Sequence, residues 1–148
     1  YILSFIYVGI YWNNHHHMMH TVKSVNGKIL WANLHLLFWL SLIPFATAWI
    51  GEHHFASFPM MLYGVILLMN AIAFNILQHV IIQSHGKNSD LAIAVGKDYK
   101  GKLSIVLYLF AVFFTTYYVQ ISAAIYIIIA LLWLIPDKSI ERKFNDKE

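Results

Sequence analysis

Long apolar runs separated by short polar clusters are the main pattern along the 148 residues of this chain. A membrane has a hydrocarbon core of roughly 30 Å, which takes about 20 apolar residues of helix to cross. Runs of about that size predict five membrane spans, at residues 1–20, 29–50, 58–84, 102–118 and 119–135. We therefore expect an all-α fold, a polytopic bundle of membrane helices that forms one transmembrane domain over residues 1–148.

Residues 103–135 form one uncharged stretch that is too long for a single membrane span, so we predict two spans in it. As a single helix, residues 103–135 would be about 50 Å long, well beyond the hydrocarbon core. A hairpin near residues 118–122 fits better. It also places all ten Lys and Arg residues on one side of the membrane, in the loops and in a tail at 136–148. These residues are Lys23, Lys28, Lys87, Lys97, Lys100, Lys102, Lys138, Arg142, Lys143 and Lys147.

Charge also predicts the orientation of the chain in the membrane. Cytoplasmic loops carry an excess of Lys and Arg, so the basic side and the carboxyl terminus are predicted to be cytoplasmic. The opposite loop offers only Glu52, His53 and His54. Five spans that end inside must begin outside, and we therefore expect one further span ahead of Tyr1.

The composition excludes several classes of protein. Charged residues make up 11% of the chain, against about 25% in soluble domains, so membrane lipid is the expected surrounding. The net charge of +3 comes from loop residues and not from one basic helix face, so no nucleic-acid partner is predicted. The absence of cysteine excludes disulfides, thiolate catalysis and a Cys-based zinc site.

Polar residues within the predicted spans gather toward the cytoplasmic side. Such groups are costly in lipid, so they usually face the bundle interior or a water-filled cavity. Asn75 and His79 are four residues apart and share a helix face, and His35 lies at a similar depth. The three are candidates either for a polar lining or for hydrogen-bonded helix packing, and the sequence leaves both open.

The histidine run at residues 15–20 invites a metal interpretation, because His16 and His20 have the i, i+4 spacing that can hold one ion. The other histidines are scattered over both sides, and no Asp or Glu precedes Glu52 to orient or bridge ligands. We assign no metal ligand, no catalytic residue and no cofactor, and we do not expect an enzyme. A histidine-rich, metal-dependent membrane oxidoreductase is one alternative, and a non-conducting membrane scaffold is another.

Two local features carry structural expectations. Pro44 lies in mid-span and should kink its helix, with Thr47 able to cover a freed carbonyl. Aromatic residues near the span ends match the belts found at membrane interfaces, and we assign them no ligand role. They are Tyr11, Trp12, Trp31, Trp49, Tyr117, Tyr118 and Trp133.

Three stretches of the chain carry a resemblance to a known family. Residues 4–16 read Ser-Phe-Ile-Tyr-Val-Gly-Ile-Tyr-Trp-Asn-Asn-His-His. They resemble the second-helix signature of the prokaryotic transmembrane protein 175 family, which is Ser-Phe followed by Trp-x-Asn-His-His. The stretch from Trp31-Ala-Asn-Leu through Leu42-Ile-Pro-Phe-Ala-Thr resembles the third helix, and residues 135–141 resemble the segment after the last helix.

The resemblance implies a potassium-permeable channel of a prokaryotic plasma membrane, with six helices per subunit and four identical subunits. It also implies that the first helix lines the pore, with an apolar constriction and an Arg-x-x-x-Phe-Ser-Asp motif. That helix is not among these residues, in agreement with the further span expected from charge. The resemblance implies that a hydrogen-bonded shell holds the Phe-Ser-Asp motif in place. The members of this shell would be Trp12, Asn14, His15, His16 and Asn33.

Overall fold

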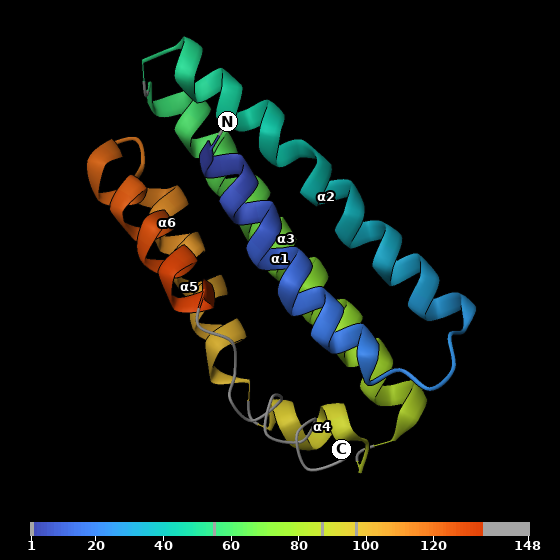
Figure 1. Ribbon diagram of the computed structural model, residues 1–148. Coiled ribbons are helices and arrows are strands. Elements are labelled where there is room, and N and C mark those ends of the chain that lie inside the picture. Colours follow the sequence, from blue (N-terminus) through green and yellow to red (C-terminus); the bar gives the residue numbers. More distant parts are fainter. Residues whose placement is uncertain (1, 55, 87, 97, 135–148) are drawn as a thin grey trace.

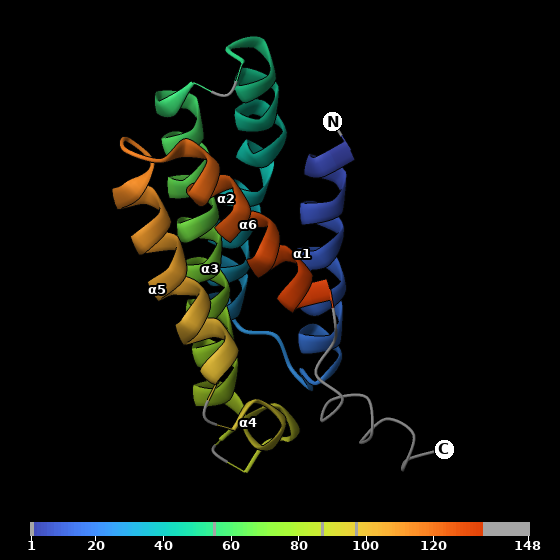
Figure 2. The ribbon, with the colours of Figure 1, turned by 90° about the vertical axis from the view of Figure 1, so that its left-hand side faces the viewer.

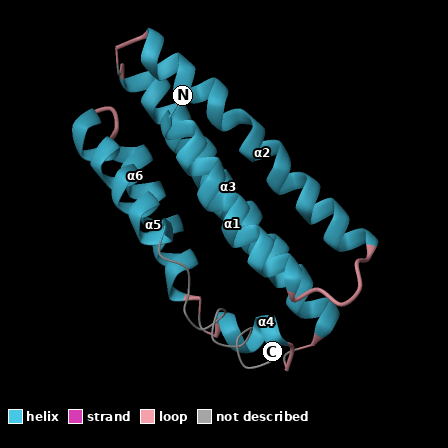
Figure 3. Ribbon diagram, in the orientation of Figure 1, coloured by secondary structure: helices cyan, strands magenta, loops and turns pink. Residues whose placement is uncertain are grey.

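A computed structural model describes residues 2–54, 56–86, 88–96 and 98–134. Within these ranges the chain forms six helices and no strand (Figures 1 and 3). The helices are α1 (Ile2–His20), α2 (Gly27–Glu52), α3 (Ser57–His85), α4 (Asp90–Val95), α5 (Tyr99–Phe114) and α6 (Val119–Leu134). The predicted all-α class is confirmed for this part of the chain.

The central helix of the bundle is α3. It packs along α2 on one side and against α5 and α6 on the other, and α1 packs against α2 and α6 (Figures 1 and 2). The chain reverses where polar residues or glycine interrupt the apolar runs. Asn26 begins α2 by accepting the backbone N–H of Ile29 at 3.0 Å, and Gly86, with φ of 89°, ends α3.

Two helices, α2 and α3, have both the length and the mean hydropathy to cross a membrane. At 1.5 Å per residue they are about 39 and 44 Å long. Helices α5 and α6 have 16 residues each, which gives about 24 Å, and α1 is polar in its second half. The structure thus supports membrane helices, and the count of five spans stays a prediction.

The hairpin between the last two spans lies earlier than predicted. Helix α5 ends at Phe114 and α6 begins at Val119, so residues 115–118 form the turn and not residues 118–122. Two buried hydroxyl groups explain the early end: Thr115 donates to the carbonyl of Ala111 at 2.7 Å and Ser122 donates to it at 2.8 Å. Ser122 thereby joins the start of α6 to the last turn of α5.

The segment between α3 and α5 has more structure than the polar connection expected at residues 85–101. It contains α4, which lies across the end of the bundle (Figure 2). Asp98 then begins α5 earlier than predicted, because its carboxylate accepts the N–H of Gly101 at 3.0 Å. The side chain of Gln78 on α3 also donates to Asp98, at 3.2 Å, so this cap fastens α5 to the central helix.

The expectation for Thr47 is wrong. Helix α2 continues through Pro44 from Gly27 to Glu52, and the hydroxyl of Thr47 donates to the carbonyl of Ile43 at 2.7 Å. The carbonyl that loses its partner to proline belongs to Leu40, and Thr47 lies about two turns beyond it. The hydroxyl follows the usual i−4 geometry of threonine in helices.

The described lysines share one end of the bundle, which we call the lysine end. The loop at residues 21–26, the segment around α4 and the start of α5 all lie there (Figure 1). Lys23, Lys28, Lys100 and Lys102 belong to these elements, and the loop after Glu52 lies at the opposite end. Lys87, Lys97 and the predicted tail with its four basic residues lie outside the described residues.

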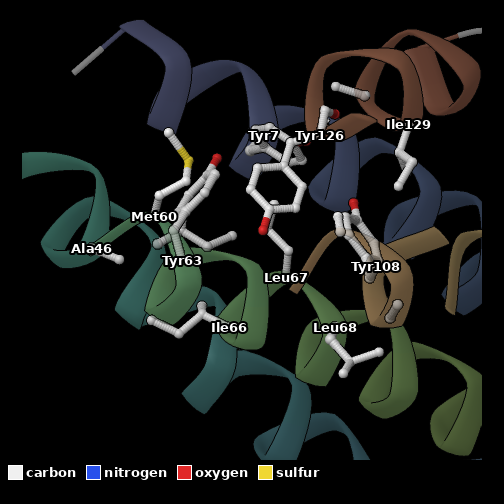
Figure 4. Close-up of a cluster of buried hydrophobic side chains, with 14 of the residues drawn as sticks. Tyr7, Ala46, Met60, Tyr63, Ile66, Leu67, Leu68, Tyr108, Tyr126 and Ile129 are labelled. Carbon is white, nitrogen blue, oxygen red and sulfur yellow. Dashed lines mark hydrogen bonds between the residues drawn. The ribbon is translucent and has the colours of Figure 1, made fainter. Parts of the chain in front are cut away.

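One tyrosine from each of four helices meets in the middle of the bundle (Figure 4). Tyr7, Tyr63, Tyr108 and Tyr126, from α1, α3, α5 and α6, are each no more than 2% exposed. Tyr63 contacts Tyr7 and Tyr126 edge-on, with ring centroids 6.0 and 5.7 Å apart. Gly64 makes this possible, because the Tyr126 hydroxyl occupies the space that a Cβ atom would take.

Candidate functional site

One face of α1 is exposed along its whole length. The residues on this α1 stripe are spaced three and four apart, as on the contact face of a packed helix. They are Ile2, Phe5, Gly9, Trp12 and His16. Phe5 and Trp12 are 72% and 63% exposed, and a Cβ atom on Gly9 would have nothing within 4 Å. A stripe with a central small residue is typical of a surface on which another membrane helix packs.

The lysine end of the α1 stripe is a ladder of aromatic rings. The indole of Trp12 stacks on the imidazole of His16, with centroids 5.4 Å apart and planes at 16°. His16 in turn contacts the ring of His20 edge-on at 5.4 Å. Trp12 and His16 therefore present their rings outward, away from the rest of the chain.

A hydrogen bond joins α1 to α2 beside this ladder. Nε2 of His15 and Oδ1 of Asn33 are 2.7 Å apart, and both side chains are half-buried. An amide oxygen only accepts, so the imidazole donates. The structure thus brings together two of the residues expected in the shell, one from each helix.

Asn14 points the other way, into the bundle. Its amide donates to the carbonyl of Ile10 at 2.8 Å within α1 and to the carbonyl of Trp133 at 3.4 Å on α6. The five residues of the expected shell therefore take three positions: two on the exposed stripe, two in a bond between α1 and α2, and one against α6.

The three candidates for a polar lining form local hydrogen bonds. Nε2 of His35 accepts from the indole of Trp39 at 3.0 Å within α2. Nδ1 of His79 donates to the carbonyl of Asn75 at 2.9 Å within α3. The imidazole of His79 is exposed, whereas the side chain of Asn75 lines an interior cavity.

That cavity has a volume of about 20 Å³ and lies between α1, α3, α5 and α6. Its size is close to that of one water molecule. Polar side chains in its wall are Asn14, Asn75 and Ser104, and most of the remaining wall is aromatic or aliphatic. The cavity is at the level of the Asn14 contact to α6.

Trp133 lines this region and makes contacts that the sequence analysis did not predict. It was expected in an interfacial belt, but its indole donates to the hydroxyl of Ser104 at 2.8 Å and its ring contacts Phe74 at 5.9 Å. Trp133 thus joins α6 to α5 and α3. The available signal was Ser104, a lone polar residue in an apolar run, which needs a partner in lipid.

The histidine run brings the rings of His16 and His20 together, but a third ligand is missing from the described part of the chain. Among these residues no three His, Cys, Asp or Glu side chains lie close enough together to hold a metal ion. The arrangement offers hydrogen bonding and stacking.

The bond between His15 and Asn33 can be measured with a double-mutant cycle. We expect His15→Ala and Asn33→Ala each to lower the free energy of unfolding, and the double variant to lose less than the sum by about 1 kcal/mol. Chemical denaturation of the full-length protein in detergent measures this coupling. The control cycle pairs Asn33→Ala with His16→Ala, whose ring stacks on Trp12, and should be additive. Equal coupling in the two cycles would show that the His15–Asn33 bond contributes nothing specific.

Comparison with known proteins assigns the chain to a family. Residues 1–44 match the family of the endosomal/lysosomal potassium channel TMEM175. A potassium channel from Chryseobacterium sp. (strain P1-3) is 55% identical over 146 residues, which are 99% of this chain and 76% of that protein. A potassium channel from Streptomyces collinus is 30% identical over 84 residues, covering 52% of this chain and 39% of that protein. No solved structure matches the chain. The chain therefore belongs to the TMEM175 family of potassium channels, which makes it an integral membrane protein and not an enzyme.

Proposed function

We propose that the chain forms the outer helices of one subunit in a homotetrameric potassium channel, which conducts passively across a prokaryotic plasma membrane. The membership of the potassium-channel family carries this proposal. In it the pore-lining helix is a segment outside these 148 residues, and the described helices hold it in place. Potassium is the permeant ion, and no cofactor takes part.

We propose five membrane crossings, by α1, α2, α3, α5 and α6, with the lysine end in the cytoplasm. These helices run in alternating directions through one bundle (Figure 1). The lysines at the ends of the helices gather on one side, which is the usual cytoplasmic pattern. Residues 1–148 would then be a single transmembrane domain with a cytoplasmic tail at 136–148.

The α1 stripe is the proposed seat of the pore-lining helix. Its apolar residues and the open space over Gly9 would let a second helix approach closely. Trp12 and His16 present their rings on the same face, and the His15–Asn33 bond holds the end of α1 on α2. We propose that these four residues support the polar motif of the pore helix. Asn14 would contribute indirectly, because its amide holds α1 against α6.

For His35, Asn75 and His79 we propose a role in helix packing and not in a pore lining. His35 and His79 each have a hydrogen-bond partner on their own helix. Such bonds reduce the cost of placing imidazole groups near lipid. The ion path would then be made by other residues.

Reversal potentials in planar bilayers test the proposed function. With potassium on one side and sodium on the other, the full-length protein should give a current whose reversal potential is displaced from zero in the direction that shows potassium to be more permeant than sodium. The mass of the protein in detergent should correspond to four chains. Absence of current would favour a scaffold, whereas stoichiometric iron after purification without an affinity tag would favour an oxidoreductase. Either result overturns the proposal.

A further inference from the structure

Two hydrogen bonds hold α1 on α6, and they lie one heptad apart. The hydroxyl of Tyr7 donates to the carbonyl of Tyr126, and the amide of Asn14 donates to the carbonyl of Trp133. Each pair is separated by 119 residues in sequence. The two helices therefore run parallel in a fixed register, and the bonds are about 10.5 Å apart along the axis.

Both acceptors are main-chain carbonyls, which makes the bonds sensitive to sliding. A carbonyl of a helix has a fixed axial position, so moving α1 by one residue shifts each donor by 1.5 Å relative to its acceptor. Both bonds would break together. Tyr7 is 2% exposed, so loss of the Tyr126 carbonyl would leave a hydroxyl that is shielded from bulk water without this partner, at a cost in free energy.

A small cavity interrupts the packing between the two bonds. Ile10 and Tyr11 on α1 and Ile129 and Ala130 on α6 lie between them, and all four line the cavity of about 20 Å³. Close packing specifies a register through interlocking side chains, and a cavity at this seam weakens that effect. The two polar bonds therefore add directional contacts to the packing and favour one register.

We infer that Tyr7 and Asn14 are positioning residues that set the axial register of α1 on α6. Register matters because α1 carries the ladder of Trp12 and His16 at its lysine end. A change of one residue would move these rings by about 1.5 Å relative to the body formed by α3, α5 and α6. The expected effect on conduction rests on the proposed function. The register itself rests on the hydrogen bonds alone.

The chain offers a matched control for each residue. Tyr7→Phe and Asn14→Leu remove the donors at nearly constant volume. Tyr11→Phe and Asn13→Leu change the same residue types on the same helix, at side chains that have no hydrogen-bond partner among the described residues. If any substitution in this part of α1 disturbs the helix, the two control variants should show the same effect.

Cross-linking reports the register directly. These 148 residues contain no cysteine, so cysteines placed at Ile10 and Ile129 form the only thiol pair once any cysteine elsewhere in the full-length protein has been replaced by serine. A short membrane-permeable bifunctional thiol reagent should link them efficiently. We expect each of Tyr7→Phe and Asn14→Leu to lower the yield about fivefold, the effect of one lost hydrogen bond, and the controls to leave it unchanged.

Single-channel recording gives the second measurement, on variants without the added cysteines. Open probability should change about fivefold in Tyr7→Phe and Asn14→Leu and remain at the parent value in the two controls. Variants that unfold at lower temperature but keep the parent cross-linking yield and open probability would overturn the inference. If the parent protein passes no potassium, the proposed function fails, and the cross-linking result still decides the register.

Discussion

Replacing Gly64 with alanine is expected to destabilise the protein by about 1 to 3 kcal/mol, and leucine at this position should prevent assembly. A Cβ atom on Gly64 would lie 2.8 Å from Cγ2 of Val112 and would overlap the hydroxyl of Tyr126. Three helices meet at this point, so no side chain can move aside without shifting a helix. Denaturation of the full-length protein in detergent measures the loss, and potassium current should fall with the folded fraction.

A second-site change makes this prediction specific. The Tyr126 hydroxyl is buried without a hydrogen-bond partner among the described residues, so Tyr126→Phe alone should be neutral or slightly stabilising. Combined with Gly64→Ala it should recover part of the lost stability, because the overlapping oxygen is gone. Gly51→Ala, where a Cβ atom meets nothing within 4 Å, is the control. A Gly64→Ala protein as stable as the Gly51→Ala protein would show that the helices approach less closely than described.

Replacing Trp133 with alanine should cost about 3 kcal/mol, the low end of the range for large aromatic residues in a core, because the side chain is partly buried. The indole bonds to Ser104 on α5, its ring contacts Phe74 on α3, and its carbonyl accepts from Asn14 on α1. The truncation would also enlarge the neighbouring cavity. Denaturation of the full-length protein and its potassium current are the measurements.

Trp133→Phe separates packing from hydrogen bonding. It keeps a ring against Phe74 and loses the bond to Ser104, so we expect a cost of only about 1 kcal/mol. Trp31 is 73% exposed on α2, and Trp31→Ala should change stability by less than Trp133→Phe does. If Trp31→Ala is as damaging as Trp133→Ala, the inward role of Trp133 is wrong and the interfacial expectation stands.

Apolar run length predicted the positions of α1, α2 and α3 to within two residues at each described boundary, because membrane helices are defined by the thickness they cross. Apolar run length did not predict the helix ends that are fixed by single hydrogen bonds. Thr115 and Ser122 end α5 through one carbonyl, and Asp98 starts it through a carboxylate cap. Nothing in an apolar pattern identifies those partners.

The same limit applies to the candidate site. Periodicity tells which residues share a face of one helix, but the first half of α1 is apolar on every side, so spacing did not tell which face is exposed. Spacing also does not tell which neighbouring helix α1 packs against, or at what position along the helix axis. Resemblance to a family put His15 and Asn33 in one expected shell. Their bond to each other, and the contacts of Tyr7 and Trp133 across α1, α5 and α6, became visible only in three dimensions.

The short α5–α6 hairpin has a consequence for the lipid around the proposed channel. Its helices are about 24 Å long, whereas α2 and α3 on the other side of the subunit exceed 35 Å. A bilayer of uniform thickness matches both flanks only where α2 and α3 tilt. Without that tilt, acyl chains beside the hairpin would shorten and those beside α2 would extend. Each subunit would therefore impose a gradient of thickness on its annulus, and shorter-chain phospholipids would be enriched beside α5 and α6.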